Sequence, residues 1–368
     1  MIRSINIHCQ GDRNMDNGIS CQHVSYSYTD EQLGVAVVCE ASSGADATRS
    51  AEGARMLCQT TVAAAKSFVK HHTHRLFKGT PFTQTAGEAP KDRKISAAEH
   101  ELRKLWNEIQ SRWTDQVSQH LNAHPLTDEE QTHETTPERR YGCGLTAYVQ
   151  HKDFWFAMQT GRGCCITFHH AAVTEEETDT GESQQIWQMQ TAEESETEPL
   201  FRLSFATDGT LPAAAFCCSE SVVKAYKSTE DFVNYCVENL KIVVKDGVST
   251  ARQQLQDDLP IISRVGTMDD TAVAAVFNLN ELRPEIPHYI LAQIDYVNRQ
   301  AAQQQALIHF FVRNKEVPTD ELTSAADRLE LLNSKIRFLA KEYRTATGKT
   351  IDDLPDYSQD LELAKEKI

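Results

Sequence analysis

The stretch from Gln32 to Arg55, QLGVAVVCEASSGADATRSAEGAR, constrains the fold more than any other part of the chain. It opens with an apolar, β-branched run over 33–39, which predicts a buried strand. A turn of small residues follows Glu40, and apolar residues then recur at helical spacing, which predicts a helix over 46–74. A carboxylate at the end of a buried strand is fixed in place, and small residues beside it let the backbone approach a ligand. The ordinary alternative is a plain strand-to-helix connection with a solvated Glu40.

The composition excludes several classes of protein. Lys and Arg number 37 against 53 Asp and Glu, a net charge of −16, so a nucleic acid is not expected as a partner. No apolar run reaches the roughly 18 residues that a membrane helix needs, and the first residues have no apolar core of a signal peptide. The 10 cysteines are therefore expected to be reduced thiols. These features predict a cytoplasmic protein without membrane contact.

Short strands joined by tight turns and interrupted by helices predict an α+β architecture of antiparallel sheets. The strands are expected at 2–8, 24–28, 33–39, 144–150, 154–160, 164–169, 200–207 and 271–277, and the later helices at 97–120, 229–244 and 250–259. Residues 122–140 and the acidic stretch 174–198 are interpreted as exposed loops.

The character of the chain changes after Pro287. Two helices, 288–313 and 320–343, are expected to form a helical hairpin around Pro318. The predicted organisation is a domain over 1–280, a hairpin extension over 287–345 and a polar, frayed tail over 346–368.

Three carboxylates stand at predicted strand ends: Glu40, Asp208 and Asp269. Scattered oxygen ligands of this kind suit magnesium or manganese, and a pair of such ions can clamp a phosphate and activate a water molecule. A zinc site is a weaker interpretation, because no two cysteines have Cys-x-x-Cys spacing, although Cys21, His23 and the His-rich tract 71–74 could supply ligands.

Five short motifs, each at a strand end, carry a resemblance to a known family: SCQH (20–23), VVCEA (37–41), TGRG (160–163), ATDG (206–209) and GTMDD (266–270). In this order they resemble the metal-dependent type 2C (PPM-type) serine/threonine protein phosphatases, in particular a bacterial branch. The resemblance runs from about Ser4 to Asn278. It implies a four-layer α-β-β-α sandwich of two antiparallel sheets flanked by helices, with two Mn²⁺ or Mg²⁺ ions at one end.

The resemblance also implies site residues, several of which depart from the family pattern. The metal ligands would be His23, Glu40, Ala41 through its carbonyl, Asp208 and Asp269. His23 stands where the family has Asp, Glu40-Ala41 replaces Asp-Gly, and Arg162 replaces the Asp of a Gly-Asp-Gly turn. The family's phosphate-binding Arg falls at Asp16, which would repel a phosphate. Arg13 and Arg162 are the candidate phosphate-binding residues in its place.

These departures leave three hypotheses. The first is a catalytically impaired phosphatase-like domain that binds a phosphoprotein or another signalling protein. The second is an active Mn²⁺- or Mg²⁺-dependent serine/threonine phosphatase in which a metal-bound water attacks the phosphate. The third places the function in the helical hairpin over 287–345, through self-association or through docking to a kinase or scaffold protein. Its ordinary alternative is a helix pair that merely covers a sheet face.

Overall fold

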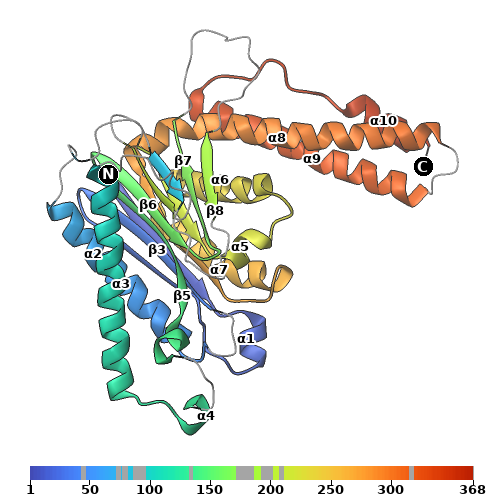
Figure 1. Ribbon diagram of the computed structural model, residues 1–368. Coiled ribbons are helices and arrows are strands. Elements are labelled where there is room, and N and C mark those ends of the chain that lie inside the picture. The colour runs from blue at the N-terminus through green and yellow to red at the C-terminus, as the bar shows by residue number, and fades with distance from the viewer. Residues whose placement is uncertain are drawn as a thin grey trace, which may run out of the picture. The chain divides into compact units, whose positions relative to one another are not determined.

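Two antiparallel β-sheets stack face to face in the first part of the chain (Figure 1). The computed structural model describes residues 1–367 apart from 43–46, 72–75, 77–81, 86–96, 132–135, 171–185, 192–201, 207–210 and 315–318. The chain divides into two compact units, Met1–Arg283 and Pro284–Ile368. The sequence analysis predicted a boundary between 280 and 287.

The first sheet has the strand order β1-β11-β10-β7-β8, and the second has the order β2-β3-β5-β6-β9-β4. The first is built from β1 (Ile2–Cys9), β7 (Cys164–Phe168), β8 (Trp187–Thr191), β10 (Ala214–Cys218) and β11 (Thr271–Asn278). The second is built from β2 (Val24–Thr29), β3 (Leu33–Ala41), β4 (Phe82–Thr85), β5 (Cys143–His151), β6 (Phe154–Thr160) and β9 (Arg202–Ala206). Every neighbouring pair is antiparallel.

Strand β3 shows why its sequence is apolar without alternation. Val35 and Val37 lie in a core that includes Leu57 of a flanking helix. Ala36 and Val38, which point the other way, pack in the core between the two sheets. Because both faces of β3 are buried, neither set of alternate residues is polar.

Helices cover the outer face of each sheet. The long helices α2 (Ser50–His71) and α3 (Ala97–Ala123) pack on the second sheet. On the first sheet lie α5 (Glu220–Lys224), α6 (Thr229–Lys245) and α7 (Val248–Val265), of which α7 packs on β1 and β11. Apolar residues three or four apart, such as Leu57 and Cys58 after Ala54 in α2, form the buried faces. The predicted sandwich of two antiparallel sheets flanked by helices is therefore confirmed.

Three strands, β4, β8 and the central β10, and two short helices, α1 (Asp12–Asp16) and α5, were not predicted from the sequence. Strand β8 lies within 174–198, so the interpretation of that stretch as an exposed loop is wrong for residues 187–191. Strand β10 reads AAFCC and pairs with both β7 and β11. All five of its residues are buried, so its sequence carries no alternation that would distinguish a strand from a buried helical turn.

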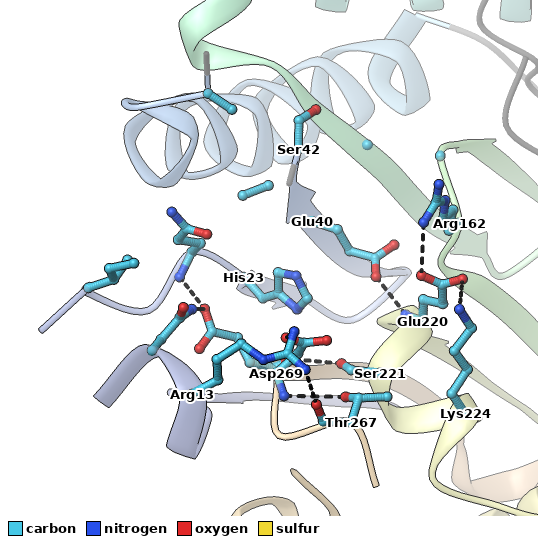
Figure 2. Close-up of a pocket in the computed structure, with 18 residues that line it drawn as sticks. Arg13, His23, Glu40, Ser42, Arg162, Glu220, Ser221, Lys224, Thr267 and Asp269 are labelled. Carbon is cyan, nitrogen blue, oxygen red and sulfur yellow. Dashed lines mark hydrogen bonds and ion pairs between the residues drawn. The ribbon is translucent and has the colours of Figure 1, made fainter. Parts of the chain in front are cut away.

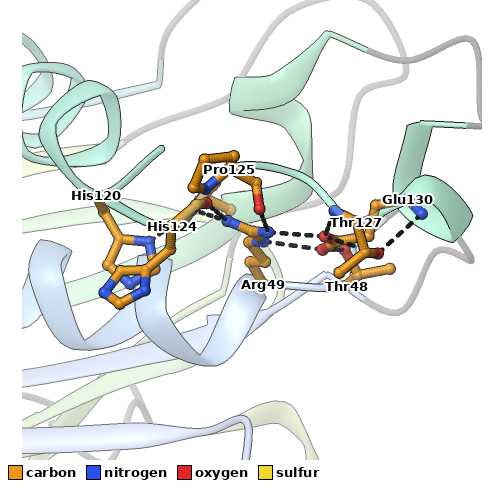
Figure 3. Close-up of polar contacts among 8 residues, drawn as sticks. Thr48, Arg49, His120, His124, Pro125, Thr127 and Glu130 are labelled. Atoms are coloured by element: carbon orange, nitrogen blue, oxygen red, sulfur yellow. Dashed lines mark hydrogen bonds and ion pairs between the residues drawn. The ribbon is translucent and has the colours of Figure 1, made fainter. Parts of the chain in front are cut away.

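The described residues of 122–140 are mostly exposed, as predicted, but many of them are helical and do not form a plain loop. They form α4 (Asp128–Gln131) and a 3₁₀ helix, η2 (Pro137–Tyr141), and Arg140 is completely buried. The guanidinium of Arg49 donates to both carboxylate oxygens of Glu130, at 2.8 and 2.7 Å, and both side chains are nearly buried (Figure 3). The Arg49–Glu130 pair can be withdrawn from solvent because its charges neutralise each other.

The Arg49–Glu130 pair joins segments that are far apart in the sequence. Arg49 lies just before α2, and its guanidinium also donates to the carbonyls of His124 and Pro125 at the end of α3. Its backbone N–H donates to the carbonyl of Arg140. The start of α2, the next described helix after β3 in the chain, is thereby held at a defined place.

The second unit contains most of α8 (Leu279–Arg313), together with α9 (Thr319–Thr347) and α10 (Ser358–Lys365). Helix α8 begins at Leu279 and not, as predicted, near His288, and it contains two prolines in its first turns. The expectation of a frayed tail is also wrong, because α10 is an ordered helix. Its Asp360 accepts hydrogen bonds from Gln305 and pairs with His309 at 2.6 Å, both in α8. No helix among the described residues is long and apolar enough to cross a membrane.

Candidate functional site

A pocket of about 550 Å³ opens where the ends of several strands meet in the first unit (Figure 2). The predicted site residues His23, Glu40, Ala41 and Asp269 line it, as do both predicted phosphate-binding residues, Arg13 and Arg162. Asp16 is not among the lining residues. The remaining predicted ligand, Asp208, lies outside the described residues, as do 72–74 of the His-rich tract.

Glu40 ends β3 and points its carboxylate into the pocket wall (Figure 2). One carboxylate oxygen accepts a hydrogen bond from the backbone N–H of Glu220, at the start of α5, at 2.5 Å. The other lies so close to Gly163 that a Cβ there would be 2.7 Å from it. Burial raises the pKa of Glu40 to about 7, against the effect of the backbone hydrogen bonds. Glu40 is therefore not the solvated side chain of an ordinary connection, and near neutral pH it is only partly ionised.

Asp269 follows the turn after α7 and is paired with a cation of the protein itself. One of its oxygens accepts a hydrogen bond from the guanidinium of Arg13 at 2.7 Å. The same guanidinium donates to the carbonyl of Thr267 at 2.9 Å (Figure 2). Arg13 is thus held across the turn by two hydrogen bonds, one of which engages one oxygen of the Asp269 carboxylate.

The neighbouring Asp270 is a structural residue that the sequence analysis quoted in a motif without giving it a role. Its buried carboxylate accepts hydrogen bonds from the N–H of Gly11 at 2.7 Å, the side-chain amide of Asn14 at 2.9 Å and the N–H of Gln22 at 2.5 Å. It thereby fixes the backbone on both sides of α1. Both aspartates of the pair line the pocket, but only Asp270 is buried and bound to backbone N–H groups.

His23 reaches the pocket from the segment that precedes β2. Burial lowers its pKa, although the carboxylates of Asp270 and Asp269 act in the opposite direction. The imidazole is therefore neutral at pH 7. Its Nδ1 atom is buried and has no hydrogen-bond partner within the described part of the chain.

Two charged residues of the pocket were missed from the sequence, Glu220 and Lys224 of α5. The Lys224 ammonium lies 2.7 Å from the Glu220 carboxylate, and the Arg162 guanidinium lies 3.8 Å from it (Figure 2). Because α5 follows β10, missing that strand also concealed the strand end that carries Glu220 into the site.

The described residues do not fit a pair of hard cations. No three His, Cys, Asp or Glu side chains in this part of the chain converge closely enough to hold a metal ion. Glu40 accepts backbone hydrogen bonds, Asp269 is occupied by Arg13, and His23 offers a neutral nitrogen where magnesium prefers an anionic oxygen.

The sequence was also compared with models of known protein families. The family model described as protein phosphatase 2C matches residues 10–259, which is more than half of the chain. The chain belongs to the protein phosphatase 2C family. The resemblance stated from the five motifs is thereby confirmed, and the pocket lies in the phosphatase 2C-like domain. Comparison with curated proteins gave no match.

Solved structures of phosphatases are similar to this chain at low identity. The serine/threonine phosphatase PstP/Ppp of Mycobacterium tuberculosis is 12% identical, and the match covers 75% of this chain and 98% of PstP, with a TM-score of 0.38. The PstP catalytic domain in complex with two manganese ions is 13% identical (75% and 97% covered, TM-score 0.38). Stp1 of Staphylococcus aureus is 10% identical (75% and 95% covered, TM-score 0.38).

Proposed function

We propose that this phosphatase 2C-like domain is catalytically impaired and that its pocket binds a phosphorylated segment of a signalling protein without hydrolysing the phosphate. The observation that carries the proposal is the ion pair between Arg13 and Asp269 at 2.7 Å. A cation of the protein itself neutralises the carboxylate that the resemblance assigns to a metal.

The other residues of the pocket support the same proposal. Two-metal hydrolysis needs ionised carboxylates with free oxygens, held in a fixed geometry. Glu40 is one methylene longer than Asp and directs one oxygen to the N–H of Glu220. His23 replaces an anionic ligand with a neutral nitrogen, which lowers the affinity for magnesium.

The same residues favour binding of a phosphate. The guanidiniums of Arg13 and Arg162 line the pocket, and a guanidinium can donate two parallel hydrogen bonds to phosphate oxygens. A phosphate carries more charge than a carboxylate, so it can compete with Asp269 for Arg13. The volume of about 550 Å³ admits a phosphorylated side chain.

The alternative is an active phosphatase that uses manganese, with His23, Glu40, Asp208 and Asp269 as ligands and a metal-activated water as the nucleophile. The buried, unpaired Nδ1 of His23 is the observation that favours it, because such an atom is expected to have a partner. In that case His23→Asp should lower activity or change the preferred metal. A large gain of activity in His23→Asp would instead support the impaired site.

Fluorescence anisotropy with a labelled phosphoserine peptide tests the proposal. We expect the peptide to bind, to remain intact in the presence of Mn²⁺, and to bind about tenfold more weakly to Arg13→Gln. Arg112→Gln is the matched control, because Arg112 is in an exposed ion pair with Glu108 on α3 and does not line the pocket. Release of phosphate, or equal binding to the Arg13 and Arg112 variants, would contradict the proposal.

A second proposal concerns self-association through 287–345. Leu331 and Phe338 lie seven residues apart on one face of α9, and both are exposed, at 71% and 58%. Apolar side chains repeated at this spacing are typical of a helix face that packs on another helix. Light scattering of the full chain should show a dimer that Leu331→Lys converts to a monomer. An unchanged mass would contradict this proposal and leave the pocket's role untouched.

A further inference from the structure

Exposed apolar side chains stand on two segments, 12–19 and 261–269, that each also contribute residues to the pocket lining, and they are here called the apolar rim: Met15, Ile19, Ile261, Val265 and Met268. In the described part of the first unit six large apolar side chains are exposed, and these are five of the six, the other being Met1. Val265 is the most exposed of them, at 72%. Single exposed apolar residues are ordinary, but a group on neighbouring segments marks an interaction site.

Hydrogen bonds tie the two segments of the apolar rim together. The guanidinium of Arg264, next to Val265, donates to Asp12 of α1 at 2.9 Å. The N–H of Arg13 donates to the carbonyl of Met268 at 3.0 Å. Met15 lies three residues after Asp12, which places both on one face of α1. Ile19 lines the pocket itself, so the rim is continuous with the site.

Met268 is held in an unfavourable backbone conformation. Its φ is 61°, the left-handed region, and it is the one residue other than glycine with positive φ among those described. The conformation is imposed from both sides, because its N–H donates to Ser263 and its carbonyl accepts from Arg13. Asn or Gly would occupy this position with less strain. The large apolar side chain of Met268 is thus 40% exposed to solvent. Both its exposure and its backbone conformation are unfavourable.

The charges around the apolar rim favour an anionic partner. In the pairs Arg264–Asp12, Arg13–Asp269 and Lys224–Glu220 the cation is the more exposed member each time, for example 67% for Arg264 against 22% for Asp12. An approaching molecule therefore meets the cations first, although the chain as a whole carries −16. Asp16, beside Met15, and Asp257, one turn before Ile261 on α7, are exposed carboxylates next to the apolar rim, so the anion is expected to enter from the side of Arg13.

We propose that the apolar rim is a docking surface for apolar side chains that flank the phosphorylated residue of a partner protein, while the phosphate enters the pocket at Arg13. The inference rests on the proposed function for the phosphate and adds the chemistry of the flanking residues. A partner of this kind would combine burial of apolar surface at the rim with charge-assisted hydrogen bonds in the pocket.

Three labelled peptides test the inference on the full chain: a phosphoserine peptide with leucine flanks, the same peptide with serine flanks, and the leucine-flanked peptide without phosphate. We expect the leucine flanks to strengthen binding of the phosphopeptide about tenfold. In Val265→Ser/Met268→Asn this advantage should fall to about twofold. Asn tolerates the left-handed conformation, so this variant is expected to fold, which thermal melting checks. Leu307→Ser, an exposed apolar residue of α8, is the matched control and should keep the full advantage.

The outcomes separate this inference from the function on which it rests. Phosphate-dependent binding without any effect of the flanks would overturn the docking surface and leave the proposed function standing. The inference would also be overturned if leucine flanks strengthened binding equally in wild type and in Val265→Ser/Met268→Asn. Absence of phosphate-dependent binding to any peptide would overturn the proposed function together with the inference.

Discussion

Removal of the Arg49 guanidinium should destabilise the fold far more than removal of an exposed arginine. Arg49→Met leaves the Glu130 carboxylate nearly buried without its cation, and it also leaves the carbonyls of His124 and Pro125 without a donor. Breaking a buried pair in this way typically costs about 3–5 kcal/mol. Glu130 keeps hydrogen bonds from Thr127 and Thr48, so we expect about 3 kcal/mol.

Urea unfolding followed by tryptophan fluorescence measures this loss. Arg112→Met is the matched control: its partner Glu108 is four residues earlier on α3, and both side chains are nearly half exposed. The free energy of unfolding of Arg112→Met should be at most about 0.5 kcal/mol below that of wild type. The double variant Arg49→Met/Glu130→Gln should recover part of the loss, because the unpaired charge is then gone. Equal losses for Arg49→Met and Arg112→Met would refute the reasoning.

The same pair predicts a dependence on pH. Hydrogen bonds from Arg49 hold the pKa of Glu130 well below its ordinary range. Because the folded pKa is lower than the unfolded one, the contribution to stability is present above the unfolded pKa and is lost as the pH falls through the folded pKa. The difference between wild type and Arg49→Met should therefore be largest near pH 7 and smaller at pH 3. An unchanged difference would show that the pair is not the source of the stability.

Three further predictions concern residues around the pocket. Asp270→Ala should destabilise the fold by about 3 kcal/mol in urea unfolding, because three donors lose their acceptor, and a loss under 1 kcal/mol would contradict this. Gly163→Ala should lower the free energy of unfolding by about 1–3 kcal/mol and weaken phosphopeptide binding, because the new Cβ would be 2.7 Å from the Glu40 carboxylate. Unchanged stability and binding would show that Gly163 is not crowded by Glu40. Met268→Asn should raise the melting temperature by relieving strain of about 1 kcal/mol, and a lower melting temperature would show that the φ of 61° is not a strain.

The fold followed from the sequence where burial leaves a pattern. The apolar run of β3, the hairpin from β5 to β6 and the helical spacing in α2 are each determined by local residues, and the predictions there were close to the observed bounds. Strand β10 was missed because all five of its residues are buried and small or apolar. The helix α10 was missed because its stability depends on Asp360 and its partners in α8, which are distant in sequence.

Six of the residues named from the sequence line one pocket, but their interactions there were not predicted. The motifs brought Arg13, His23, Glu40 and Asp269 to one pocket, as expected of strand ends in a stacked pair of sheets. That Arg13 would pair with Asp269 could not be predicted, because 255 residues lie between them and the pairing depends on how α1 meets the turn after α7. The contact of Glu40 with α5 likewise required β10 to be placed.

The central claim is that this phosphatase 2C-like pocket retains a phosphate-binding role and has lost metal-dependent hydrolysis. Calorimetric titration of Mn²⁺ into metal-stripped protein, with phosphopeptide hydrolysis measured on the same sample, tests it most directly. The account predicts no stoichiometric Mn²⁺ binding and no release of phosphate, while the intact phosphopeptide still binds. Binding of Mn²⁺ together with turnover that Asp208→Ala abolishes would contradict the account and establish an active phosphatase with a substituted ligand set.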